Sequence, residues 1–186
     1  MVGSTCHRIL NLVNAFPVVG EKIAHRDIGS GLSVTYPSGF FDGATTSNIG
    51  GVDFTLHISS SHYFHVKLGC GVRTNKSAEL MALWSLLVFA VSIGLATLSV
   101  FGDSQVIKNW ANSVAWLAVV DLEHWHDHIY EVKTPFLSIN FQHIYREHNT
   151  SVDVLSKEAL SLEMGKISFI EILEGETIGS GTLLLF

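Results

Sequence analysis

Cysteine is nearly absent from this sequence. Its 186 residues include only Cys6 and Cys70, whose spacing matches neither a metal site nor a redox motif. So sparse a pair argues against a disulfide scaffold, and both thiols are expected to be inert. We expect no targeting signal in this sequence either, because Asn11 and Asn14 interrupt the apolar run RILNLVNAF. These absences favour a cytoplasmic or nuclear protein.

Positive charge is also scarce. The chain has 11 Lys and Arg residues against 17 Asp and Glu, which gives a net charge of -6. Sequence-independent affinity for nucleic acid comes from Lys and Arg. This chain alone is therefore expected to bind nucleic acid weakly, with help from a fused or partner domain. Hydrophobic residues make up 47% of the sequence, which predicts a folded domain with a substantial core.

Charged residues are missing altogether from Leu80 to Phe101, a stretch long enough to cross a bilayer. Ile93-Gly94 is typical of a helix end, however, and the following LATLSVF is typical of a buried strand. Elements buried in an α/β fold can be hydrophobic on every side. We therefore favour a buried helix followed by a buried strand, and keep a membrane span as the less favoured alternative.

The pattern of elements indicates an α/β domain over residues 33–162, preceded by a leader or linker (1–32) and followed by a tail without assigned structure (163–186). In chain order we expect a short strand at FFDGA, a hairpin of strands 51–58 and 63–68, a helix from Ser77 to Ile93, a strand at 98–101, helices at 104–111 and 121–132, a strand at 136–145, and a last helix carrying Asp153. This order predicts a mixed five-stranded sheet, with three antiparallel strands followed by parallel strands, flanked by helices.

Four carboxylates stand at the boundaries of these elements. They are Asp42 in FFDGA, Glu79 in TNKSAELMAL, Asp103 in LSVFGDSQVI and Asp153 in HIYREHNTSVDVLSK. Catalytic groups of open α/β sheets gather beyond the carboxyl ends of strands, where Asp42 and Asp103 are expected. Glu79 is expected in the first turn of a helix capped by Ser77, where the helix dipole favours a negative charge.

Packing four carboxylates together is costly unless a cation neutralises them, because like charges disfavour each other's ionisation. Magnesium is the natural partner, since it takes oxygen ligands and often binds through one or two carboxylates and substrate phosphates. The four acidic residues therefore predict a two-metal phosphodiester hydrolase. Each residue alone has an ordinary explanation as a turn, cap or solvated helix residue.

Taken in order, FFDGA, TNKSAELMAL, VFGDSQVI and QHIYREHNTSVDVLSKEAL resemble the ribonuclease H family. The resemblance runs from about Phe40 to Leu160 and looks closest to the ribonuclease H-like domains of plant retroelements and their domesticated relatives. It implies endonucleolytic hydrolysis of the RNA strand of RNA·DNA hybrids, with Mg²⁺ or Mn²⁺ as cofactor. A reverse transcriptase domain or protein is an implied partner.

The resemblance also assigns roles to the four acidic residues. Asp42 would bridge both ions, and Asp153 would help to hold the ion that activates water. Glu79 and Asp103 would hold the ion that stabilises the leaving oxygen. Such a pair of ions clamps the attacking and departing oxygens of an in-line displacement.

Other positions are expected to contact the substrate or assist the reaction. Gly43 lets another group approach the backbone beside Asp42, and the resemblance adds Thr74 and Asn75 as contacts to the hybrid. His148 in a loop and His143 in a strand precede the last aspartate. Both histidines are candidates for proton transfer or product release, provided that they lie within reach of the proton.

Two further interpretations stay open. The first is a catalytically decayed, retroelement-derived module that binds nucleic acid or a protein partner, and the negative net charge favours it. The second is a zinc site at His124 and His128, which share a face of the predicted helix 121–132. No HExxH motif or cysteine pair supports zinc, so we favour a solvated helix face there.

Overall fold

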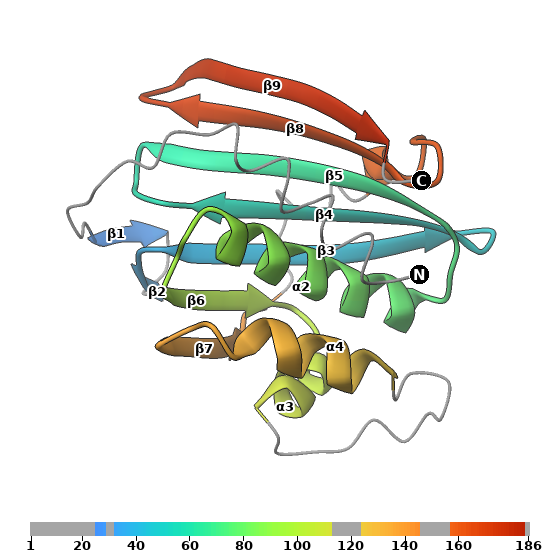
Figure 1. The fold of residues 1–186 in the computed structure, drawn as a ribbon, viewed down its shortest axis with the longest axis horizontal. Helices are drawn as coiled ribbons and strands as arrows, with labels where there is room; N and C mark the ends of the chain where they lie inside the picture. The colour runs from blue at the N-terminus through green and yellow to red at the C-terminus, as the bar shows by residue number, and fades with distance from the viewer. Residues whose placement is uncertain (1–24, 29–31, 113–123, 146–156, 185–186) are drawn as a thin grey trace.

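The computed structural model of this protein describes residues 25–28, 32–112, 124–145 and 157–184 (Figure 1). The strands of its main sheet are β3 (Ser38–Thr46), β4 (Ile49–His57), β5 (His62–Val72), β6 (Thr97–Gly102), β7 (Ser138–His143), β8 (Lys166–Leu173) and β9 (Glu176–Leu184). They lie in the order β7-β6-β3-β4-β5-β8-β9, and the separate strands β1 (His25–Ile28) and β2 (Leu32–Thr35) pair with each other.

The centre of the main sheet has the predicted mixed topology. Strands β3, β4 and β5 are antiparallel neighbours, whereas β6 runs parallel to β3 and β7 runs parallel to β6. The turn between β3 and β4 is tight, with positive φ angles of 50° at Ser47 and 63° at Asn48, as two-residue hairpins require. Strand β3 therefore continues past Asp42 and does not end there as predicted, because it pairs with β4 as far as this turn.

Helix α2 (Asn75–Ser92) lies along one face of the sheet (Figure 1). It is buried on nearly every side, which explains the long uncharged stretch of sequence. The contact with β3 is close, because a side chain at Gly39 would overlap Leu86. The helix ends as predicted, with Gly94 just beyond its cap at a φ of 82°. Within the described residues, no helix has the length and hydropathy needed to cross a membrane.

The start of α2 differs from the prediction. Thr74 caps the helix, and its hydroxyl accepts a hydrogen bond from the Ser77 backbone N–H at 3.3 Å. Ser77 is therefore the third helical residue, and Glu79 lies in the second turn. Because the effect of the helix dipole fades within the first turn, the dipole does not account for the charge at Glu79.

Two shorter helices pack beside α2 and β7. They are α3 (Gln105–Ala111) and α4 (His124–Lys133). The Lys133 Nζ donates a hydrogen bond to the Ala111 carbonyl at 2.6 Å, which joins the two helices, and the Trp125 ring packs edge-on against Trp84 of α2 at 6.4 Å. Trp125 and Ile129 of α4 are buried, whereas His124 is exposed.

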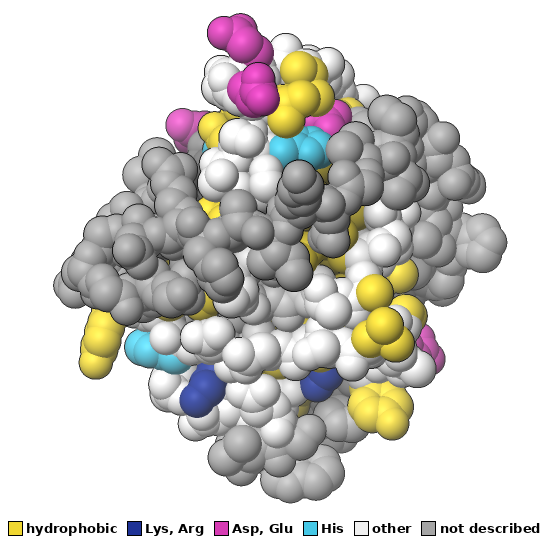
Figure 2. All heavy atoms as spheres, turned by 90° about the vertical axis from the view of Figure 1, so that its left-hand side faces the viewer, with side chains coloured by type: hydrophobic (Ala, Val, Ile, Leu, Met, Phe, Trp, Pro, Cys, Tyr) yellow, Lys and Arg dark blue, Asp and Glu magenta, His cyan; other side chains and the backbone are white. Residues whose placement is uncertain are grey.

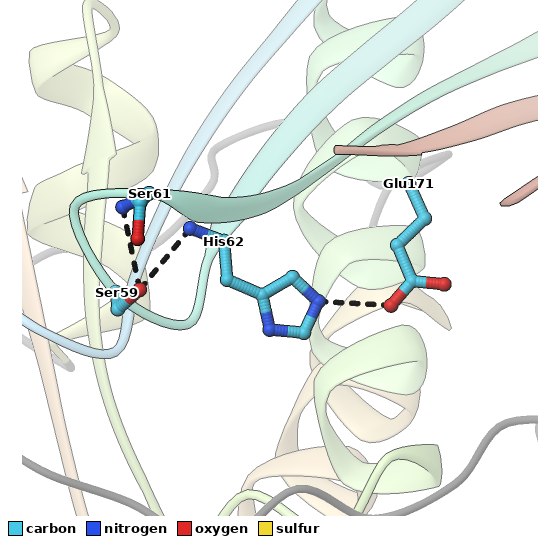
Figure 3. Close-up of polar contacts among 4 residues, drawn as sticks. All are labelled: Ser59, Ser61, His62 and Glu171. Atoms are coloured by element: carbon cyan, nitrogen blue, oxygen red, sulfur yellow. Dashed lines mark hydrogen bonds and ion pairs between the residues drawn. The ribbon is translucent and has the colours of Figure 1, made fainter. Parts of the chain in front are cut away.

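The C-terminal residues correct the predicted strand number. A hairpin of β8 and β9 adds to the edge of β5, so the sheet has seven strands and not five. Strand β8 pairs antiparallel with β5, and His62 adds a side-chain contact, since its Nε2 lies 2.8 Å from Glu171 Oε1 (Figure 3). The turn before β5 is closed by Ser59, whose hydroxyl accepts from the backbone N–H groups of Ser61 and His62 at 3.3 and 3.1 Å. Residues 163–186 therefore belong in large part to the sheet.

The face of the sheet opposite α2 is covered differently. A small apolar cluster of Tyr36, Phe40, Phe101 and Ile144 lies there, and Ala159, in the helical residues 157–159, is fully buried. The predicted helix that carries Asp153 lies mostly outside the described residues. Most of the predicted leader lies outside them too, although residues 25–28 pair with 32–35.

Candidate functional site

Asp42 and Asp103 lie at the same edge of the sheet. In the parallel pair of β3 and β6, Phe40 is opposite Phe101, and each aspartate follows its phenylalanine by two residues. Strand β6 ends at Gly102, so Asp42 lies on β3 where that neighbour stops. Asp42 is 8% exposed, whereas Asp103 is partly exposed. In Figure 1 the arrowheads of β3 and β6 point to the right-hand side of the molecule, and the first turn of α2 lies on that side.

Glu79 reaches the same edge because α2 packs against β3 at Gly43. A methyl group at Gly43 would overlap the backbone of Ala78 and Glu79. The group that approaches Gly43 closely is the backbone of α2, and contact of Gly43 with the substrate stays a prediction. This contact covers Gly43, which is buried.

The carboxylate of Glu79 is electrostatically coupled to both aspartates. Burial raises the pKa of Glu79 to about 7; a hydrogen bond from the Ser104 hydroxyl opposes the rise, while Asp103 and Asp42 add to it. The Asn75 side-chain amide donates to Glu79 Oε1 at 3.2 Å, and the Thr45 hydroxyl donates to Asn75 Oδ1 at 3.5 Å. Glu79 is thus oriented from β3 and from its own helix.

A fifth carboxylate, Asp53, lies beside Asp42 and was missed by sequence reasoning. It is directly opposite Asp42 in the pair of β3 and β4 and is 0% exposed. Neither of its oxygens has a hydrogen-bond partner within the part of the chain that the structure describes. Burial raises the pKa of Asp53 to about 8, Lys67 opposes the rise, and Asp42 and Glu158 add to it. The available signal was a charged residue inside the strand IGGVDFTLH.

This donor set suits a hard divalent cation. Asp42, Glu79 and Asp103 offer only oxygen ligands, which Mg²⁺ and Mn²⁺ accept, and their mutual repulsion is relieved by a cation. No three His, Cys, Asp or Glu side chains of the described ranges are arranged to hold a metal ion by themselves. Asp153, the fourth predicted ligand, lies outside those ranges.

The other predicted site residues differ in their exposure and in their hydrogen bonds. Thr74 and Asn75 are both exposed at the start of α2, and each side chain also makes the hydrogen bond described above. His143 is partly buried in β7, and its Nε2 donates to the Asp103 backbone carbonyl at 3.1 Å. It therefore adjoins the site through the backbone of Asp103. His148 lies outside the described residues.

The described side chains at the opposite end of the molecule are unsuited to bind phosphates. Figure 2 shows this end, where acidic side chains gather at the level of β8 and β9. Glu174 and Glu176 are exposed at the turn between these strands. Basic side chains on this face are few and lie apart from one another among the side chains drawn in colour.

Residues 40–159 match the family model described as "Reverse transcriptase-like". Among curated proteins, none matches this sequence significantly. The matched range begins two residues before Asp42 and ends at the buried Ala159. It contains all four predicted acidic residues.

The solved structures that this chain resembles include ribonucleases H. RNase H1 from the halophilic archaeon Halobacterium salinarum is 27% identical, with a TM-score of 0.60, and the match covers 66% of this chain and 96% of that one. The N-terminal RNase H domain of a Mycobacterium tuberculosis protein is 22% identical, with a TM-score of 0.59 and coverages of 66% and 93%. LC11-RNase H1 in complex with an RNA/DNA hybrid is 22% identical, with a TM-score of 0.58 and coverages of 66% and 95%.

Proposed function

This chain belongs to the ribonuclease H family, and we propose that it hydrolyses the RNA strand of RNA·DNA hybrids with two divalent metal ions. The observation that carries the proposal is geometric: Asp42 and Asp103 lie side by side where β6 ends, and the packing of α2 on Gly43 brings Glu79 to the same edge of the sheet. Residues that are far apart in sequence are brought there by β3, α2 and β6. A structural role alone does not require three carboxylates at one place.

We assign the metal ligands by their position in the family motifs. Asp42 would bridge the two ions, Glu79 and Asp103 would hold the ion at the leaving oxygen, and Asp153 would help to hold the ion at the attacking water. Bound Mg²⁺ or Mn²⁺ supplies the positive charge that stabilises the attacking and departing oxygens.

The other residues of the site orient these ligands and the substrate. Asn75 restricts the side chain of Glu79 through its hydrogen bond, and Thr45 in turn donates to Asn75, which preserves the geometry that the reaction needs. Thr74 and Asn75 are exposed next to this edge and are our candidates for contacts to the hybrid. Contacts to 2′-hydroxyl groups would distinguish the RNA strand from DNA. His143 and His148 remain candidates for an auxiliary role.

Charge supports approach of the hybrid from the site end. The acidic turn between β8 and β9 would repel phosphates, whereas Lys76 is exposed near the start of α2. A net charge of -6 predicts weak binding by this chain alone. We therefore propose that a reverse transcriptase domain or protein assists binding, in the cytoplasm or nucleus. Co-purification with and without such a partner would test this.

The decisive test is cleavage of a labelled RNA·DNA hybrid in Mg²⁺ and in Mn²⁺, beside double-stranded RNA and double-stranded DNA. We expect cleavage of the RNA strand of the hybrid only, and loss of detectable product in Asp42→Asn. Ser38→Ala, a buried change on the same strand and face, serves as the folded control. A folded protein that binds the hybrid and releases no product in either metal would instead be the decayed binding module.

A further inference from the structure

Asp53 is placed to act together with Asp42. Directly opposite residues of an antiparallel pair project from the same face of the sheet, and Asp42 is opposite Asp53 in the pair of β3 and β4. This face is the one away from α2, because α2 packs on the alternate positions Gly39 and Gly43. The two carboxylates are therefore neighbours on one surface, one strand apart.

The part of the chain that the structure describes does little to compensate a charge on Asp53. Neither carboxylate oxygen accepts a hydrogen bond from the described residues, although the side chain is fully buried. Lys67 is opposite Asp53 on β5, but its Nζ bonds to Glu158 Oε2 at 2.5 Å. A buried charge without a partner is strongly unfavourable. An apolar residue would fill the same position without that cost.

A cation at Asp42 would supply what Asp53 lacks. A divalent ion attracts a carboxylate on the neighbouring strand even when it does not bind directly, and this attraction is strong inside a protein. Carboxylates behind the direct ligands commonly orient a metal site and strengthen it. The burial of Asp53 is unfavourable in the metal-free protein, and binding of a cation at Asp42 would offset this unfavourable free energy.

We propose that Asp53 is a fifth acidic residue of the metal centre, a positioning residue that strengthens divalent-cation binding at Asp42. The inference rests on the proposed function, since it takes Asp42 as a metal ligand. It assigns Asp53 no contact with substrate. It also makes two predictions of opposite sign in alkaline buffer, where Asp53 is ionised, because removal of its charge should weaken metal binding and stabilise the metal-free protein.

The experiment titrates Mn²⁺ into the metal-free full-length protein by calorimetry and records thermal unfolding without metal, both in alkaline buffer. We expect Asp53→Asn to weaken Mn²⁺ binding about tenfold to hundredfold, the range found for residues behind direct ligands, and to raise the metal-free Tm. Ser38→Ala is the matched control, because it removes another buried oxygen without a hydrogen-bond partner from the same face. Its Mn²⁺ affinity should equal that of the wild type.

Unchanged Mn²⁺ affinity in Asp53→Asn would overturn this inference, and a lowered metal-free Tm would then assign Asp53 to structure alone. Should Asp53→Asn fail to fold, Asp53→Ser replaces it, and failure of both to fold also overturns the inference. Asp42→Asn separates the two proposals. If it loses Mn²⁺ binding while Asp53→Asn keeps it, only the role of Asp53 is wrong. If the wild type binds no Mn²⁺, both proposals fail.

Discussion

The two faces of the central sheet are built from different residues. The face under α2 is apolar, and Val52, Phe54, Val66 and Leu68 pack there against the helix. On the opposite face the same strands place Asp53 and Thr55 of β4 and Lys67 of β5. Alternation along the strands produces the difference, because successive side chains point to opposite faces.

The face under α2 contributes mainly to stability, whereas the opposite face carries the candidate catalytic groups. Burial of apolar surface under α2 is the main favourable contribution to folding. The opposite face retains buried polar groups that are unfavourable unless they have partners. Residues of the first face hold the strands in place, and residues of the second face carry the carboxylates whose cost a cation would offset. Four experiments test this difference between the two faces.

The largest effect is expected from a cavity on the α2 face. Leu83→Ala removes a fully buried side chain and should lower the free energy of unfolding by about 2–5 kcal/mol, as measured by urea denaturation. Ile144→Ala is the matched change on the opposite face. It should cost less, because Ile144 belongs to a cluster of four buried residues only and loses fewer packing contacts. Equal losses would contradict the contrast between the faces.

A smaller loss of stability is expected at Gly43, where α2 packs against β3 beside the site. Gly43→Ala forces α2 away from β3 and should cost about 1–3 kcal/mol, as overpacking does. Cleavage of the hybrid should fall as well, because Glu79 moves with the helix. Gly94→Ala is the control, since it strains a residue with φ of 82° but meets nothing within 4 Å. If both variants cleave like the wild type, the close contact is unimportant for the site.

The polar face also predicts a pH dependence in the metal-free protein. Glu79 and Asp53 have folded-state pKa values of about 7 and about 8, above their ordinary values of 4.5 and 3.8. The folded protein keeps protons that the unfolded chain has released, so stability should fall as pH rises through this range.

The free energy of unfolding is expected to be lower at about pH 8.5 than at about pH 5.5, by about 1 kcal/mol or more, because one pKa unit corresponds to about 1.4 kcal/mol. Asp53→Asn should flatten this slope, and Mg²⁺ should restore stability at the higher pH. A wild-type slope that rises with pH would contradict the raised pKa values. Denaturation in urea at several pH values provides the measurement.

The smallest effect is expected at the added hairpin. His62→Ala removes the partner of Glu171 and should cost about 0.5–1.5 kcal/mol, the usual range for one hydrogen bond. Amide hydrogen exchange should rise in β8 and β9 and stay unchanged in β3. Glu171→Gln retains an acceptor for His62 and should show less exchange than His62→Ala. Faster exchange throughout the sheet would mean that the hairpin is essential to the domain.

Local patterns predicted the central elements correctly. Alternating and apolar runs identified the strands around Asp42 and Asp103, and the glycine at 94 marked the end of α2. The start of α2 was predicted three residues late, because Thr74 and Ser77 are both good capping residues and only the fold decides between them. The hairpin of β8 and β9 escaped prediction, because its turn uses Glu174 and Gly175 in place of a common Asn-Gly pair.

The sequence by itself determined the family, the order of the central elements and the identity of the acidic motifs, because these depend on residue types and spacing along the chain. Only the tertiary structure decided which side chains meet. The register of β3 against β4 puts Asp53 beside Asp42, and the packing of α2 on Gly43 brings Glu79 to the same edge. These are contacts between distant segments, and pairing register and close packing form only when the strands and helix assemble.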